Sequence, residues 1–175
     1  MRFDAKAYGP DVAKILAVGD NGERLMPLVR SAAFSPETKA AIQTLAERKS
    51  VPDAAIAGLY LYFSCWDEAH DIAQNISTRE GSYWHAIVHR QEPDAGNAGY
   101  WFRQVGAHPI FPALRERAAE IGVDFGPRWD PIAFINLCER ARQEPGSDAE
   151  RLALETQRAE WQLLFDYCAA KSAGA

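Results

Sequence analysis

Apolar residues recur at helical spacing along almost the whole chain. Between residues 54 and 65, for example, Ile56, Leu59, Tyr60 and Phe63 fall on one face of a helix. No segment bounded by turn residues shows the sustained alternation of apolar and polar positions that is typical of a β-strand. The pattern therefore predicts an all-α fold.

Capping residues predict where several of these helices begin. Ser35 followed by Pro36 combines a cap with a proline at the first helical position, and this helix is expected to continue to residue 46. Asp53 is the predicted cap of a central helix over residues 54–65, and a turn near residues 64–67 leads to the next helix. Further predicted caps are Asp11, Asp94 and Asp130. We expect about seven or eight helices in all.

Two segments fit the capping box, in which a serine and a glutamate three residues later satisfy each other's backbone amides. Ser77 and Glu80 predict the start of one helix, which should end near Gln91 because Pro93 disfavours helical geometry at the residue before it. Ser147 and Glu150 predict the start of a final helix over residues 151–170.

A faint internal repeat relates residues 57–76 to residues 86–105, with Ala57 matching Ala86 and Ala69 matching Ala98. This pattern of small residues resembles that of tetratricopeptide helical hairpins, although the spacing of 29 residues is shorter than the usual 34 or so. The resemblance implies antiparallel hairpins stacked within one domain. We expect that single helical domain to cover residues 1–170 and residues 171–175 to form a frayed tail.

Composition narrows the class of partner. The 175 residues are 47% hydrophobic and 25% charged, which is ordinary for a globular protein, and the formal net charge is -5. Lysine and arginine form no dense cluster, which argues against nucleic acid or an anionic membrane as the main partner. A neutral or cationic small molecule, or another protein, is expected instead, and the oligomeric state is left open.

Cysteine usage and the absence of long apolar runs favour a cytoplasmic protein. Cys65, Cys138 and Cys168 are odd in number and widely spaced, so they form neither a disulfide framework nor a Cys-x-x-Cys motif. The first residues do not have the pattern of a signal peptide, and no apolar run approaches the roughly 18 residues that span a bilayer.

The candidate chemistry lies around His85 and His89, which are four residues apart and therefore lie on one face of a helix, one turn from each other. With a nearby carboxylate such as Glu92, this pair is a reasonable ligand set for zinc, iron or manganese. The residues between the histidines are Ala-Ile-Val, so the glutamate of His-Glu-x-x-His metalloproteases is absent. Candidates for a third ligand are His70, His108, Asp67, Glu68, Asp71 and Glu92.

The same residues admit a structural interpretation. Histidines among aromatic side chains commonly form hydrogen bonds that hold neighbouring helices in register. Arg90 and Arg103 could clamp a carboxylate or phosphate, or pair with a local acid. Trp84 and Trp101 could line a ligand pocket or belong to the core, and Asn97 is a further candidate for ligand binding.

Four segments, residues 82–90, 97–109, 129–131 and 160–168, resemble an uncharacterised family of small bacterial and fungal proteins. The resemblance covers about residues 53–168 and implies a shared fold, but it implies no activity. It also implies that His85, His89, Arg90, Asn97 and His108 belong to one recurring pattern.

Two hypotheses from different classes follow. The favoured one is a binding or interaction module in which the histidines are structural. The alternative is a metal-dependent enzyme that uses His85, His89 and a third group, with Glu92 as ligand or base.

Overall fold

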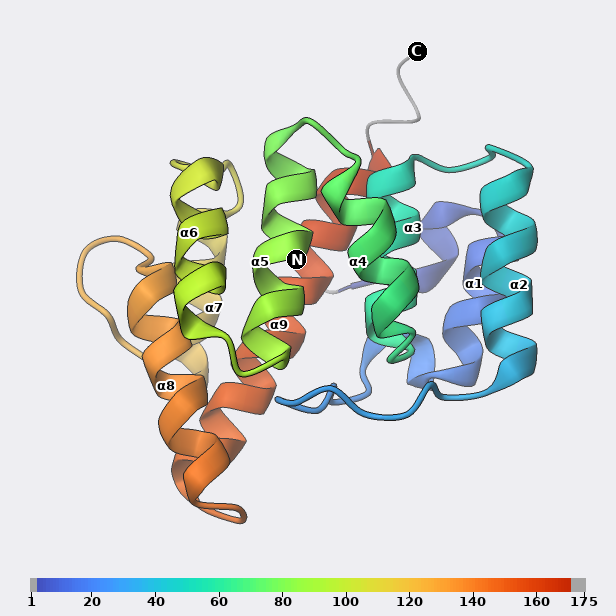
Figure 1. Ribbon diagram of the computed structural model, residues 1–175. Coiled ribbons are helices and arrows are strands. Elements are labelled where there is room, and N and C mark those ends of the chain that lie inside the picture. Colours follow the sequence, from blue (N-terminus) through green and yellow to red (C-terminus); the bar gives the residue numbers. More distant parts are fainter. Residues whose placement is uncertain (1–2, 171–175) are drawn as a thin grey trace.

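The computed structural model describes residues 3–170, and within them helices are the only regular elements (Figure 1). The predicted all-α fold is confirmed. The described part contains nine α-helices and two short 3₁₀ helices, which is more than the seven or eight expected. They are η1 (Ala5–Tyr8), α1 (Pro10–Val18), η2 (Asp20–Gly22), α2 (Pro36–Glu47), α3 (Asp53–Tyr62), α4 (Trp66–Gln74), α5 (Arg79–Gln91), α6 (Ala95–Val105), α7 (Phe111–Ile121), α8 (Pro131–Gln143) and α9 (Asp148–Ala170).

Several predicted caps are confirmed because their hydrogen bonds are local. The Ser35 hydroxyl accepts a hydrogen bond from the backbone N–H of Thr38 at 3.0 Å. Helix α2 begins at Pro36, directly after this cap, as predicted. The carboxylates of Asp94 and Asp130 cap α6 and α8 in the same way. The end of α5 at Gln91, two residues before Pro93, is also as predicted.

Other predicted boundaries are wrong. Residue 78 rather than Ser77 precedes the first residue of α5, and its side chain makes no capping hydrogen bond, so the predicted capping box does not form. Helix α3 ends at residue 62 instead of 65, because Ser64 takes a positive φ of 58° that ends helical geometry. Asp11 lies within the first turn of α1, which begins at Pro10, since proline suits the first helical position.

The capping box at the start of α9 forms only in part. The hydroxyl of Ser147 accepts the backbone N–H of Glu150 at 3.2 Å, as the motif requires. The Glu150 carboxylate, however, accepts the N–H of Gly146 at 2.6 Å, so the motif is displaced by one residue on that side. Helix α9 consequently begins at Asp148, three residues earlier than predicted. The predicted frayed tail, residues 171–175, lies outside the described residues.

The long C-terminal helix joins two hydrophobic clusters. One cluster includes the fully buried Trp84 and Trp161 and draws on α3, α5 and the second half of α9. The other includes Leu114 and Phe134 and draws on α7, α8 and the first half of α9. Leu163 of α9 packs against both clusters, and Figure 1 shows α9 passing behind α5. The packing of these clusters fixes the position of α5 within the fold.

Small residues allow the helices around α5 to approach closely. Ala57, Ala69, Ala86 and Ala98, the residues matched in the internal repeat, are all buried. Gly58 of α3 is equally necessary, because a Cβ atom there would lie 2.8 Å from the ring of Trp84. Helix α4 packs between α3 and α5, and α6 packs on α5. The face of α5 that carries the histidine pair is therefore turned toward α4.

Within residues 3–170, no helix has both the length and the apolar character needed to cross a membrane.

Candidate metal centre

Three imidazole rings meet where α4 packs against α5. His70 comes from α4, and His85 and His89 come from successive turns of α5. Each ring offers one nitrogen, and these three nitrogens lie within 4.8 Å of one another. Nε2 of His70 and Nε2 of His85 are 3.0 Å apart. The structure thus brings His70, one of the candidates for a third ligand, to the predicted histidine pair.

The ring orientations follow from the helices that carry them. His85 and His89 are one turn apart, and their rings stack with centroids 4.8 Å apart and planes 22° from parallel. The ring of His70 stands nearly perpendicular to both, at 88° and 89°. An edge of His70 therefore faces the two stacked rings, so ring nitrogens from both helices point into a common space.

Two tryptophans flank the three histidines. Trp66 of α4 stacks on His70 with centroids 5.2 Å apart, and Trp101 of α6 stacks on His85 with centroids 4.1 Å apart. The indole N–H of Trp66 also donates to the carbonyl oxygen of Val88 at 3.2 Å, which links α4 directly to α5. These flat apolar contacts limit the rotation of the imidazoles and shield them partly from water.

Burial keeps the central histidine neutral. His85 is only 4% exposed, and burial, together with the nearby His70 and His89 rings, lowers its pKa from 6.5 to about 4. Its Nδ1 atom is buried and has no hydrogen-bond partner among the described residues. Neutral imidazole is the form that binds metal ions, so His85 carries a free lone pair near neutral pH.

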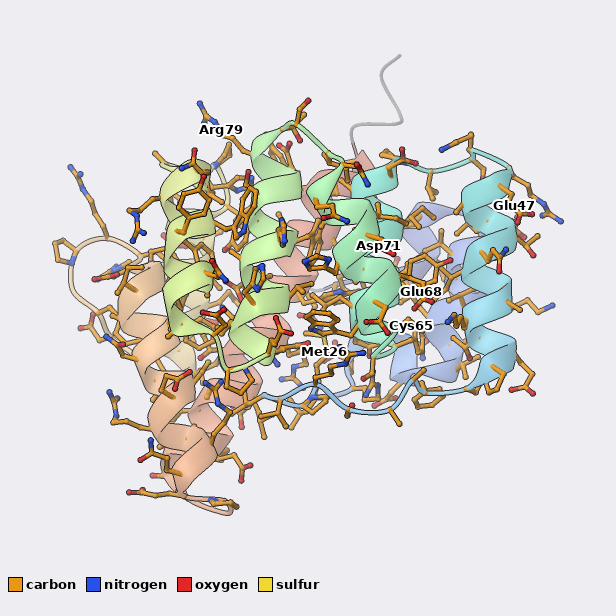
Figure 2. All side chains as sticks on the ribbon, in the orientation of Figure 1. Met26, Glu47, Cys65, Glu68, Asp71 and Arg79 are labelled. Carbon is orange, nitrogen blue, oxygen red and sulfur yellow. The ribbon has the colours of Figure 1, made fainter. Side chains whose placement is uncertain are left out.

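Carboxylates lie on the outer side of the other two rings. Nδ1 of His89 is 3.3 Å from an oxygen of Glu92, an ion-pair distance at an angle that does not make a hydrogen bond. Nδ1 of His70 is 3.9 Å from an oxygen of Asp71, whose side chain is labelled on α4 in Figure 2. Carboxylates placed behind the free nitrogen of a ligating histidine are a common second layer of metal sites. The structure thus places Glu92 behind His89 and not among the converging nitrogens.

His108, another candidate ligand, lies away from this cluster. Its ring packs edge-on against Tyr83 and Tyr167, with centroids 5.2 and 5.0 Å away. Its Nδ1 accepts the backbone N–H of Ile110 at 3.3 Å, within the turn that precedes α7. It is not among the three histidines whose nitrogens converge.

Arg90, a candidate for clamping a ligand, is buried in the interior and already paired with a carboxylate. Arg90 is 1% exposed, and its guanidinium donates to the equally buried carboxylate of Glu160 at 2.5 Å. Its guanidinium carbon also lies 4.4 Å from the ring centroid of Phe134. The arginine therefore joins α5 to α8 and α9 inside the protein and does not face the three histidines.

The remaining ligand-binding candidates are dispersed. Trp84 is fully buried in the core, and the side chain of Asn97 donates to Asp94 at 2.7 Å at the start of α6. Arg103 is exposed on α6, where it lines a separate pocket. Of these ligand-binding candidates, Trp101 is the one that stacks on a histidine of the cluster, His85.

Two residues that contact the candidate site residues, Trp66 beside His70 and Glu160 beside Arg90, were not singled out from the sequence as site residues. Trp66 precedes His70 by four residues, so the same helical spacing that pairs His85 with His89 could have revealed it. Glu160 is 70 residues from Arg90, and no local signal connects the two.

Comparison of the chain with protein-family models, with curated proteins and with solved structures finds no match.

Proposed function

We propose that the protein binds one divalent transition-metal ion through His70, His85 and His89. The observation that carries this proposal is the convergence of three ring nitrogens within 4.8 Å. In a tetrahedral zinc site the metal–nitrogen distance of about 2.0–2.1 Å places ligand nitrogens about 3.3 Å apart. The His70–His85 pair, at 3.0 Å, already has close to this spacing. The pairs that include His89 must move closer by up to about 1.5 Å, which rotation of the partly exposed His89 side chain can supply.

The ligand types favour zinc or another borderline metal, since imidazole suits zinc, copper, iron and nickel. Three neutral ligands leave the full charge of the ion in place and one coordination position open. At such a position zinc lowers the pKa of bound water to about 7, so hydrolysis is the reaction class that we propose. In this proposal Glu92 orients His89 from behind, and Trp66 and Trp101 hold the other two rings.

A second candidate function has its own observation. The 3.0 Å contact between Nε2 of His70 and Nε2 of His85 is also the geometry of a direct hydrogen bond between helices α4 and α5. Under this proposal the histidines are structural and the protein is an interaction module built from stacked hairpins. Support for the hairpins comes from the packing of α3 on α4, of α4 on α5 and of α5 on α6. Helices α4, α5 and α6 lie side by side in Figure 1.

Metal analysis of protein purified without a histidine tag tests the first proposal. We expect about one zinc or other transition-metal ion per chain, either as purified or after incubation with zinc and removal of excess. The variants His70→Ala, His85→Ala and His89→Ala should each lose that ion, whereas His108→Asn, a change to the histidine outside the cluster, should keep it. Circular dichroism would establish that each variant is folded.

The same proteins distinguish the two candidates. If the ion is the function, chelation lowers the melting temperature of the wild type but not that of His89→Ala. If the histidines only brace the helices, no stoichiometric ion is retained, and His85→Ala lowers the melting temperature equally with and without chelator. Absence of bound metal after incubation with zinc and with ferrous iron would refute the metal proposal.

A further inference from the structure

A second site, separate from the histidine cluster, lies between α6, α7 and the segment that leads into α8. It is a pocket of about 670 Å³, within the range of roughly 300–1,000 Å³ that is typical of small-molecule sites. Its buried lining includes the rings of Phe102, His108 and Trp129, and its cationic lining consists of Arg103, Arg115 and Arg128. None of the three clustered histidines lines it.

The charge of this pocket is opposite to that of the whole protein. The chain has a formal net charge of -5, yet the pocket lining contains three arginines and a single carboxylate, that of Glu116. Across residues 3–170, none of these three guanidinium groups lies within ion-pair distance of a carboxylate. Their charges are therefore not neutralised internally, which favours an anionic occupant.

Further features indicate that the pocket is already shaped for binding. The Nε–H of Arg115 donates to the carbonyl oxygen of Gly126 at 3.0 Å, which holds this guanidinium group against the loop and leaves its terminal nitrogens available. Pro112, Pro127 and Pro131 stiffen the rim because each fixes its own backbone φ. A preformed pocket loses little conformational entropy when a ligand enters.

The indole ring of Trp129 is part of the lining. Trp129 is 6% exposed, and its Nε1 atom is buried without a hydrogen-bond partner in the described part of the chain. A buried donor that forms no hydrogen bond is costly, so a rotation of the indole that brought this N–H to a ligand oxygen would add affinity. The ring itself offers an apolar face to an aromatic ligand.

We infer that this pocket binds a small aromatic anion, with its ring against Trp129 and Phe102 and its carboxylate or phosphate group held by Arg103, Arg115 and Arg128. The ring accounts for the apolar walls, and the anionic group accounts for three guanidinium groups that have no carboxylate partner among the described residues. This site goes beyond the metal centre and does not depend on it.

Isothermal titration calorimetry with defined probes tests the inference on the full chain. The probes are naphthalene-2-carboxylate, 2-naphthyl phosphate and the neutral naphthalene-2-carboxamide. At least one of the two anions should bind saturably at one site, at least about tenfold more tightly than the neutral amide. The stronger anion identifies which anionic group the pocket prefers, and the indole N–H resonance of Trp129 should shift during the titration.

Variants at the exposed arginines locate the binding. Replacing both Arg103 and Arg128 by glutamine should weaken the anion about tenfold or more. The control Arg117→Gln removes a similar charge from α7 at a side chain that lines a different pocket, and it should leave the affinity unchanged. Three results would overturn the inference: no saturable binding of either anion, equal binding of the neutral amide, or equal loss in Arg117→Gln. Tighter binding of a hexaglutamate peptide than of either anion would overturn it as well, because the site would then recognise an acidic peptide.

Discussion

Replacing Glu160 by glutamine should destabilise the protein more than almost any other single isosteric change. Glu160 is fully buried, and its carboxylate accepts hydrogen bonds from Arg90 at 2.5 Å and from the hydroxyl of Tyr83 at 3.1 Å. Burial alone would lower the pKa of the Arg90 guanidinium, but Glu160 raises that pKa above its ordinary value. The substitution therefore leaves a full positive charge in the interior without a counter-ion.

The magnitude follows from this geometry. Removing one partner of a buried pair costs about 3–5 kcal/mol, against a total unfolding free energy of about 5–15 kcal/mol for a typical domain. The amide introduced at position 160 keeps the volume and can still accept from Tyr83, so little of the loss comes from packing. At a typical slope of about 2 kcal/mol per molar urea, the unfolding midpoint should fall by roughly 2 M.

Urea unfolding followed by circular dichroism measures this loss, and a double variant isolates its cause. Arg90→Met combined with Glu160→Gln should lose less than the sum of the two single variants, by at least about 2 kcal/mol, because no charge is then left unpaired. Glu155→Gln, the same chemical change at an exposed ion pair with Arg151 on the same helix, should cost less than about 1 kcal/mol. A loss below about 1 kcal/mol for Glu160→Gln would show that the pair is hydrated and would refute the reasoning.

Three further predictions concern packing, thiol reactivity and metal linkage. Gly81→Ala drives a Cβ atom into the backbone carbonyl oxygen of Ile76 and should cost about 1–3 kcal/mol in urea unfolding. Gly96→Ala, whose Cβ atom would make an ordinary contact with the Asp94 carboxylate at 3.5 Å, should be neutral or slightly stabilising, and equal losses would contradict this. Burial raises the pKa of the Cys65 and Cys138 thiols to about 11. At about pH 8, Ellman's reagent should therefore label these two thiols far more slowly in the folded than in the denatured protein. Rapid labelling of either thiol in the folded protein would contradict this. Zinc at about 100 times its dissociation constant should add about 2.7 kcal/mol of stability to the metal-free wild type in chemical unfolding, and nothing to His85→Ala.

Features that depend on neighbouring residues in the chain could be predicted. Asp94 caps α6 and Ser35 caps α2 because each side chain reaches an amide three residues away. The shared face of His85 and His89 follows from helical spacing alone. The failed capping box at Ser77 shows the limit of such rules, because a local motif states which hydrogen bonds are available and not which of them form.

Contacts between distant segments could not be predicted in the same way. Arg90 and Arg103 both suggested ligand clamps, but packing placed the first in a buried ion pair with Glu160 and the second at the rim of a pocket, without an ion pair to any described residue. Six residues of three types, histidine, aspartate and glutamate, could have supplied the third group beside His85 and His89, and their spacing in the sequence did not favour any one of them.

By itself the sequence determined the helical class, several helix boundaries and the face on which two histidines stand, because helices are governed by interactions across three or four residues. The tertiary structure decided which helices meet. Packing of α4 against α5 brought His70 to the pair, packing of α9 through the centre buried Arg90, and the turn after α6 took His108 to another environment. Such contacts depend on how whole helix surfaces fit together, and that fit is a property of the folded chain.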